Sequence, residues 1–212
     1  MTIVVQTLSE QVYSLIRDRI ISGELSSETA IRQDALAKEL GVSKIPLREA
    51  FARLERDSLL SSIPNRGYFV RPLSTAEAEE VYALRLKIEP DAVGIACKVA
   101  SEADIQAARD ALKAFDEADP SDRAAHGKLN RAFHMALVSP MAQHITTEIV
   151  ERLNIMSERY ASKHLEPEGR YNRAESEHGE LLQAWEKRDA ALVTKRMRAH
   201  ILSTLEDLRK QF

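Results

Sequence analysis

The sequence has little of what builds disulfide-linked, many-stranded or membrane-spanning proteins. Its 212 residues include one cysteine, Cys97, which excludes an intrachain disulfide framework and a cysteine-ligated zinc ribbon. Seven glycines and seven prolines are about half the usual share, which disfavours a sandwich or barrel with many turns. No apolar run approaches the roughly 20 residues of a membrane helix, and residues 1–11 lack the basic-then-apolar order of a secretory signal. These absences predict a helical, cytoplasmic protein without a membrane partner.

The charge is distributed unevenly along the chain. The net charge of −3 would by itself argue against a nucleic-acid partner. Residues 43–71, however, hold six Lys and Arg against three Asp and Glu, whereas the excess of acidic residues lies in residues 76–212. Since phosphate groups respond to local charge, the N-terminal segment remains suited to DNA.

Residues 1–73 show the pattern of a small DNA-binding domain. Apolar spacing predicts three short helices, the first ending near Gly23 and the others over residues 31–40 and 44–57. Ser43 is expected to cap the third helix through its hydroxyl, with Pro46 in the first turn. Two short apolar runs around the turn at residues 64–67 predict a two-stranded hairpin. This order predicts a winged helix-turn-helix.

In such a domain the third helix lies in the major groove. Arg48 can donate two hydrogen bonds to guanine, and Lys44 can make a similar contact less rigidly. Arg32 begins the second helix and Arg66 lies at the hairpin turn, so both could reach phosphates or groove edges. Basic residues on a short helix are usually a solvated face, but the tight turn at Gly41-Val42, the cap and the basic hairpin together favour DNA.

Residues 74–212 predict a second, all-helical domain. Six or so amphipathic segments follow the boundary at Pro72 and Ser74, and none has the alternation of a strand. Pro90 is expected to kink or interrupt the first of these helices. The predicted fold class is therefore mainly α, a winged helix-turn-helix followed by a helical bundle.

Four side chains of the second domain could form a metal site. Asn130 and His134 are four residues apart and share a helical face, and His178 and His200 fall on later helices. Three imidazoles and an oxygen ligand suit zinc, nickel or a similar divalent ion. Scattered histidines are more often surface or core residues, and spacing leaves both readings open. The other three histidines are expected to be structural or exposed: His126, His144 and His164.

The N-terminal third resembles the winged-helix domain of the GntR family of bacterial transcription regulators. The run GVSKIPLREA at residues 41–50 is the most specific part, and RGYFV at residues 66–70 supports it. The resemblance implies that Lys44 and Arg48 contact an operator and that Arg66-Gly67 enters the minor groove. The sequence departs from the family at Lys44, where Arg is usual, and at Ser58, where Gly is usual. The predicted DNA-contacting set is Arg32, Ser43, Lys44, Pro46, Arg48, Arg66 and Gly67.

Three segments of the second domain resemble the FCD effector domain of FadR-type regulators, in a length typical of the six-helix VanR-type subgroup. They are NRAFH at residues 130–134, EHGELLQA at residues 177–184 and MRAHI at residues 197–201. In metal-binding members an Asp and three His hold a divalent ion at the floor of an effector pocket. These positions map to Asn130, His134, His178 and His200. The neutral amide of Asn130 is a weaker ligand than a carboxylate, but the more positive site favours an anionic effector.

Arg85 has two possible roles. It matches an arginine that points into the pocket in relatives, which implies a clamp on an effector carboxylate. Alternatively, it forms an ion pair with Glu89 one helical turn away.

These features predict a homodimeric, ligand-responsive regulator of operator DNA, which senses a small organic acid. The resemblance implies repression more often than activation. One alternative is a metal-dependent hydrolase, for which Glu177 is the nearby candidate base and no H-E-x-x-H motif is present. Another is a constitutive DNA-binding protein whose bundle only dimerises.

Overall fold

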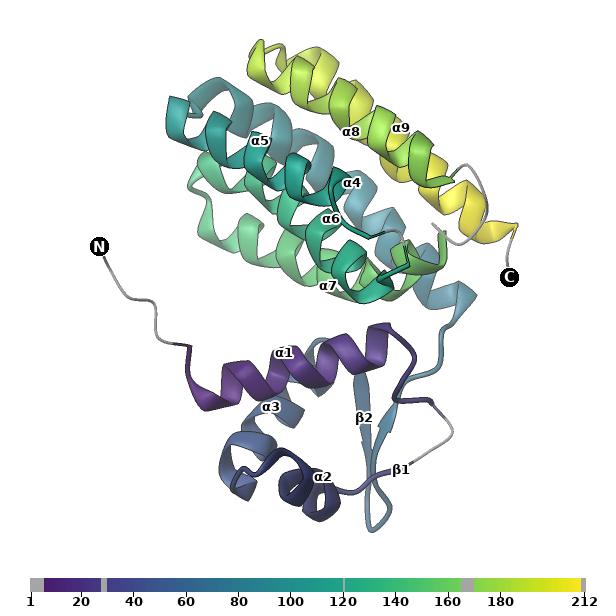
Figure 1. The fold of residues 1–212 in the computed structure, drawn as a ribbon. Helices are drawn as coiled ribbons and strands as arrows, with labels where there is room; N and C mark the ends of the chain where they lie inside the picture. Colours follow the sequence, from purple (N-terminus) through teal and green to yellow (C-terminus); the bar gives the residue numbers. More distant parts are fainter. Residues whose placement is uncertain (1–5, 28–29, 120, 165–169, 211–212) are drawn as a thin grey trace. The chain divides into compact units, whose positions relative to one another are not determined.

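The structure is a computed structural model that describes residues 6–27, 30–119, 121–164 and 170–210 (Figure 1). Its internal contacts divide the chain into two compact units, Met1–Pro72 and Leu73–Phe212. The first is a winged helix-turn-helix and the second a helical bundle, so the predicted fold class is confirmed. No helix in the described residues is both long and apolar enough to cross a membrane.

The N-terminal unit packs three helices against a small sheet. Its elements are α1 (Leu8–Ile21), β1 (Ala30–Ile31), α2 (Gln33–Leu40), α3 (Lys44–Arg56), β2 (Leu60–Ile63) and β3 (Gly67–Val70). The strands are antiparallel in the order β1-β3-β2, with Phe69 opposite Ser61 on one side and Ala30 on the other. Helix α1 packs on α3, and Ile16, Leu47 and Phe51 are fully buried. This core holds α3 with its opposite face in solvent.

Two local predictions for this unit are wrong. Ile31 was expected to begin a helix, but it pairs with Tyr68 in β1, so the sheet has three strands instead of two. A two-residue strand is too short to show alternation. Ser43 is the N-cap of α3, but its hydroxyl makes no capping hydrogen bond. The third residue of the helix is Pro46, which has no N–H to donate to that hydroxyl.

Left-handed backbone occurs where α2 and α3 end. Gly41 ends α2 with φ of +64°, a conformation that glycine adopts at no steric cost, and the chain then enters α3 within three residues. Ser58, at the position where the family usually has Gly, has φ of +59°. The expectation of local backbone strain at Ser58 is therefore confirmed.

The C-terminal unit is a bundle built around one long helix. Its elements are α4 (Thr75–Val99), α5 (Glu102–Asp116), α6 (Arg123–Val138), the 3-10 turn η1 (Ser139–Met141), α7 (His144–His164), α8 (Arg170–Glu186) and α9 (Ala190–Arg209). Helix α4 packs against α6, α7, α8 and α9, and α8 lies alongside α9 (Figure 1). Side chains from α4, α6, α7, α8 and α9 can therefore meet in one core.

Pro90 lies inside α4, and the helix continues through it from Thr75 to Val99. The expectation that Pro90 could interrupt the helix is wrong. Proline leaves the carbonyl of Leu86 without its helical donor, and the guanidinium of Arg198 on α9 donates to that oxygen at 3.2 Å. The carbonyl of Pro90 in turn accepts from the hydroxyl of Thr194 at 3.0 Å. Helix α9 thus supplies the hydrogen bonding that keeps α4 continuous.

Candidate functional site

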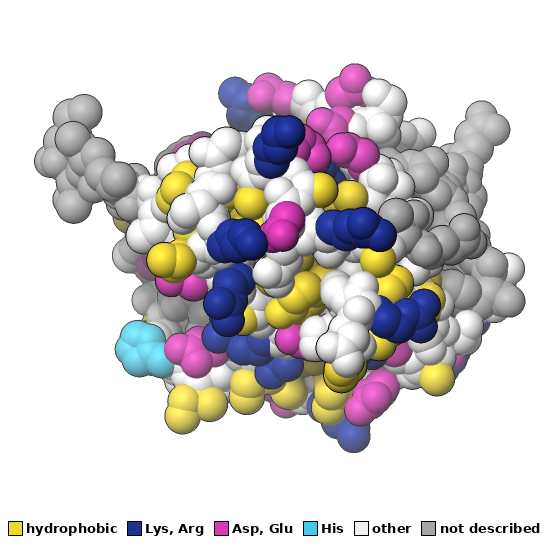
Figure 2. Space-filling model, turned by 90° about the horizontal axis from the view of Figure 1, so that it is seen from below, with side chains coloured by type: hydrophobic (Ala, Val, Ile, Leu, Met, Phe, Trp, Pro, Cys, Tyr) yellow, Lys and Arg dark blue, Asp and Glu magenta, His cyan; other side chains and the backbone are white. Residues whose placement is uncertain are grey.

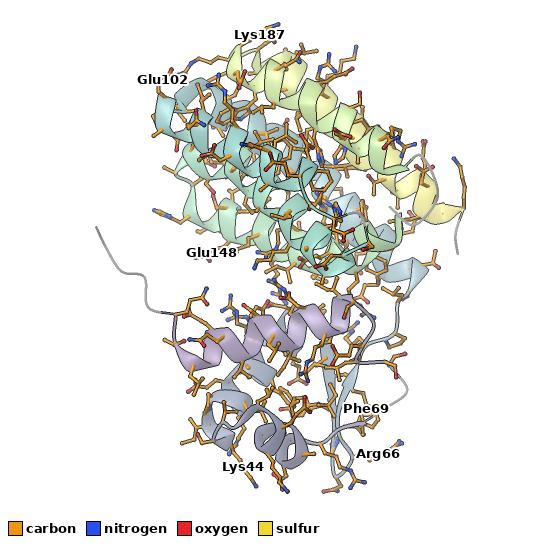
Figure 3. All side chains as sticks on the ribbon, viewed as in Figure 1. Lys44, Arg66, Phe69, Glu102, Glu148 and Lys187 are labelled. Carbon is orange, nitrogen blue, oxygen red and sulfur yellow. The ribbon has the colours of Figure 1, made fainter. Side chains whose placement is uncertain are left out.

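The first candidate site is the outer face of α2, α3 and the hairpin turn. Lys44 is the first residue of α3 and Arg48 lies one turn further on, and both are exposed. Arg66 lies in the turn between β2 and β3, and Gly67 begins β3 with φ of +96°. Lys44 and Arg66 lie at the same end of this unit (Figure 3), and that end carries several Lys and Arg side chains (Figure 2).

The remaining residues of the predicted DNA-contacting set differ in exposure. Arg32 and Ser43 are exposed at the starts of α2 and α3. Pro46 is buried, so its ring packs inside the unit instead of standing beside Lys44 and Arg48. The Lys44 ammonium pairs with the carboxylate of Asp34 on α2 at 2.7 Å, and both side chains are mostly exposed. The face therefore combines outward cations with one acidic side chain that competes for Lys44.

The second candidate site is a cluster of three histidines in the core of the bundle. His134 on α6, His178 on α8 and His200 on α9 each offer a nitrogen, and the three nitrogens lie within 4.8 Å of one another. All three side chains are buried, at 0%, 0% and 9% exposure. The Nε2 atoms of His178 and His200 are 3.3 Å apart. The structure thus brings together the three histidines that the sequence singled out.

His134 is tied to a buried polar network on α4 and α7. Its Nδ1 lies 2.5 Å from Oε1 of Glu89. The Glu89 carboxylate also accepts from both Nε and Nη2 of Arg85, at 2.8 and 3.0 Å, and from Nδ2 of Asn154 at 3.2 Å. Arg85 in turn donates to the hydroxyl of Ser157 at 3.0 Å. The ion pair between Arg85 and Glu89 is therefore present, and it lies directly beside His134.

His200 has its own carboxylate partner. Its Nδ1 lies 2.7 Å from Oε2 of Glu177, which also accepts from the hydroxyl of Ser203 and pairs with Arg173 at 3.4 Å. Glu177 was the candidate general base of the hydrolase alternative. Because its carboxylate faces Nδ1 of His200, it lies on the opposite side of the imidazole from Nε2 and the other histidines. The geometry gives that alternative no support.

Burial and neighbouring charges decide the protonation of this core. Burial lowers the pKa of His134 to about 4, against an opposing effect of Glu89, and burial also holds the pKa of His178 well below its usual range. Burial acts to raise the pKa of Glu89, but the charges of Arg85 and His134 and their hydrogen bonds outweigh it and lower the pKa. At neutral pH the imidazoles of His134 and His178 are therefore neutral, next to an ionised Glu89 carboxylate.

The donor atoms of the cluster fit a divalent metal ion. Nε2 of His134 is buried and has no hydrogen-bond partner among the described residues. Metal–nitrogen bonds of about 2.1 Å place two ligand nitrogens roughly 3.0–3.4 Å apart, which matches the separation of His178 and His200. Neutral imidazoles are also the protonation state that metals require. Asn130 lies one turn before His134 on α6 and is partly buried, and its role as a ligand stays a prediction.

Sequence reasoning missed most of the groups that surround the histidines. Glu89 was considered only as the ion-pair partner of Arg85. The i, i+4 spacing of these two residues was the sequence signal that could have marked Glu89. Asn154 and Ser157 on α7 carry no motif that could have marked them. Of the remaining histidines, His126 is buried beside Phe115 and His144 is exposed, while the side chain of His164 lies outside the described residues.

A winged helix-turn-helix joined to an all-helical domain with a buried polar core is the architecture of a transcription regulator with a sensory domain. Two family models match this chain. The model for bacterial regulatory proteins of the gntR family matches residues 8–70, and the model for the FCD domain matches residues 80–203. The chain therefore belongs to the GntR family and carries an FCD domain, as the resemblance of its motifs implied.

Individual relatives agree with this assignment. The chain is 35% identical over 129 residues to the Nta operon transcriptional regulator of Aminobacter aminovorans, a match that covers 61% of this chain and 60% of that protein. It is 25% identical over 206 residues to the HTH-type transcriptional repressor GlaR of Escherichia coli, covering 91% and 92%. The solved structure of E. coli McbR/YncC superposes with a TM-score of 0.81 at 21% identity, covering 98% and 99% of the two chains, which shows the shared fold.

Proposed function

We propose that this protein is a ligand-responsive repressor whose C-terminal unit binds a small carboxylate through a divalent metal ion. The observation that carries the proposal is the convergence of three buried imidazoles from α6, α8 and α9 within 4.8 Å. His134, His178 and His200 would hold the ion, with Asn130 as the fourth protein ligand. Zinc and nickel suit three imidazoles and an amide oxygen.

The charges of the core explain why an anionic effector would need the ion. The imidazoles of His134 and His178 are neutral, and the positive charge of Arg85 is already balanced by Glu89 in a buried pair. A bound divalent ion would supply the positive charge that holds a carboxylate oxygen. Because Asn130 is neutral, that charge would stay larger than it would be beside an Asp.

Arg85 is the proposed second contact for the effector. Its Nε and one Nη2–H bond Glu89, and Nη1 bonds Ser157, which leaves part of the guanidinium's five donors for another acceptor. An effector carboxylate would use the remaining donors or take the place of Glu89. Arg85 would thereby join effector binding to the packing of α4 against α7.

The N-terminal unit would bind operator DNA as half of a homodimer. Arg48 and Lys44 on α3 would reach base edges in the major groove, while Arg66 and Gly67 would approach the minor groove and Arg32 the backbone. Two recognition helices must match two half-sites at a fixed spacing, so a small change in the dimer alters operator affinity. A coupling of about 1–3 kcal/mol would change that affinity by roughly 5–150-fold.

The proposal is tested in two stages. Metal content is measured after purification, and a thermal-shift screen of sugar acids, hydroxy acids and dicarboxylates is run with and without zinc or nickel. The operator is then selected from random duplexes, and its affinity is measured by fluorescence anisotropy with each acid that stabilises the protein. We expect at least one acid to bind only in the metal-loaded form and to weaken operator binding. Operator binding that responds to no acid in the presence of metal would contradict the proposal.

A further inference from the structure

Two of the three clustered histidines contact a carboxylate through Nδ1. His134 Nδ1 lies 2.5 Å from Glu89, and His200 Nδ1 lies 2.7 Å from Glu177. An ionised carboxylate can only accept, so each Nδ1 carries the proton. Nη2 of Arg85 also lies 3.4 Å from Nδ1 of His134, but it donates to Glu89 at the shorter distance of 3.0 Å, so the contact with Glu89 decides the tautomer. In a neutral imidazole this leaves the lone pair on Nε2.

The two Nε2 atoms are then the acceptor nitrogens of their rings. Nε2 of His200 lies 3.3 Å from Nε2 of His178, and Nε2 of His134 is buried without a hydrogen-bond partner in the described part of the chain. A buried acceptor without a donor is costly unless something else binds it. Both lone pairs are therefore available to a shared ion, and that of His134 has no other partner among the described residues.

The carboxylates are themselves held in place from different helices. Glu89 on α4 is fully buried and accepts from Arg85 and Asn154 as well as His134. Glu177 on α8 is 28% exposed and is held by Ser203 and Arg173. Each carboxylate can thus act as a fixed support for its imidazole.

His178 has no such support, which sets it apart from the other two. Its Nδ1 is buried with no hydrogen-bond partner among the described residues. The rings of Phe115 and Phe133 pack against it, with centroids 5.0 and 4.8 Å away. Packing fixes the plane of this ring, and in the metal-free protein its Nε2–H can donate to the Nε2 lone pair of His200, a proton that a bound ion would displace.

We infer that Glu89 and Glu177 are positioning residues of the candidate metal centre, each fixing one histidine in the tautomer whose Nε2 binds the ion. The inference rests on the proposed function for the presence of the ion, but the two hydrogen-bonded pairs exist in the metal-free protein. Carboxylate partners of ligand histidines typically contribute 10–100-fold to metal affinity. Because His178 lacks one, most of the orientation of the site comes from α4 and α8.

The first test is the tautomer of each histidine in the metal-free, full-length protein. Long-range 1H–15N spectra of protein labelled in its histidines distinguish Nδ1–H from Nε2–H directly. We expect His134 and His200 to be neutral with the proton on Nδ1. A proton on Nε2 of both rings would overturn the inference, whether or not the protein binds metal.

The second test is zinc affinity, measured by competition with a chelating dye. Glu177→Gln and Glu89→Gln should each weaken binding by roughly 10–100-fold, because a glutamine amide can donate to Nδ1 and move the proton to Nε2. The control is Glu180→Gln on the same helix as Glu177, where the glutamate pairs with Arg196 at the surface, and it should bind zinc as the wild type does.

The two failures are distinguishable. Glu89→Gln removes the counter-charge of a buried Arg85 and can unfold the protein. If that variant does not fold, the test rests on Glu177→Gln, because Glu177 is partly exposed. Wild-type affinity in folded Glu177→Gln would overturn the inference for His200. A wild type that binds no zinc or nickel would overturn the proposed metal function instead, while the tautomers would still test the two hydrogen bonds.

Discussion

Lys44 and Arg48 lie on an exposed face of the N-terminal unit, whereas His134, His178 and His200 are buried in the C-terminal unit, two of them against a carboxylate. Lys44 makes one exposed ion pair, with Asp34, and can exchange it for a phosphate or base. Glu89 alone contacts three different side chains: Arg85, His134 and Asn154. The difference indicates that the outer face adapts to its partner, while the core site is fixed before any ligand arrives.

The largest expected effect is on the free energy of unfolding, when a buried ion pair of α4 is broken and compared with an exposed ion pair of the same helix. Glu89→Ala leaves the buried guanidinium of Arg85 without its counter-charge, which should lower the free energy of unfolding by about 3–5 kcal/mol. The matched control is Glu79→Ala, also on α4, which breaks an exposed pair with Arg209. Its free energy of unfolding should stay close to that of the wild type. Denaturant titrations of both variants make the comparison, and equal losses would contradict it.

Metal removal should destabilise only the C-terminal unit. Zinc at about 100 times its dissociation constant would stabilise the fold by about 2.7 kcal/mol, and a chelator should reverse this. The fluorescence of Trp185, the single tryptophan, follows this unit because the side chain is fully buried in it. His178→Ala should abolish the response, while His144→Ala at the exposed start of α7 should keep it. A shift that persists in His178→Ala would place the metal elsewhere.

On the outer face, Arg48→Ala should cost about 1–3 kcal/mol of operator affinity, or roughly 5–150-fold, by removing a two-point contact with guanine. Anisotropy titrations should show a larger loss of affinity for the operator duplex than for random duplexes. Arg109→Ala, which breaks an exposed pair with Glu186 in the bundle, is the control. If both variants bind the operator as the wild type does, α3 is not the recognition helix.

The smallest expected effect concerns Asp34. Asp34→Asn releases Lys44 and removes a negative charge from the face, so affinity for any duplex should rise by up to about fivefold. The gain should shrink as salt screens the charges. Titrations at two salt concentrations test this, with Asp110→Asn in the bundle as the control. A loss of affinity would mean that Asp34 holds Lys44 in its binding position.

Elements whose apolar pattern repeats over many residues could be predicted from the sequence. The winged helix-turn-helix, the six helices of the bundle in the described residues and the three histidines followed from spacing and motif. The strand β1 has two residues and no period to detect. The unbroken path of α4 through Pro90 depends on Arg198 and Thr194, which are more than 100 residues away along the chain.

The environment of the histidines was harder to predict than their identity. Glu89 reaches His134 across 45 residues, and Asn154 reaches Glu89 across 65. Such contacts depend on how helices pack, which leaves no local pattern. The missing cap at Ser43 is different, because Pro46 already stood at the third helical position and could not donate.

The central claim is that the buried histidine cluster and the exposed recognition helix are coupled. The direct measurement is reciprocal: operator affinity with and without a stabilising organic acid, and affinity for that acid with and without operator, both on metal-loaded protein. Thermodynamic linkage predicts the same factor in both titrations, between about 5 and 150. An acid that binds the metal-loaded protein but leaves operator affinity unchanged, with its own affinity unchanged by operator, would contradict this claim.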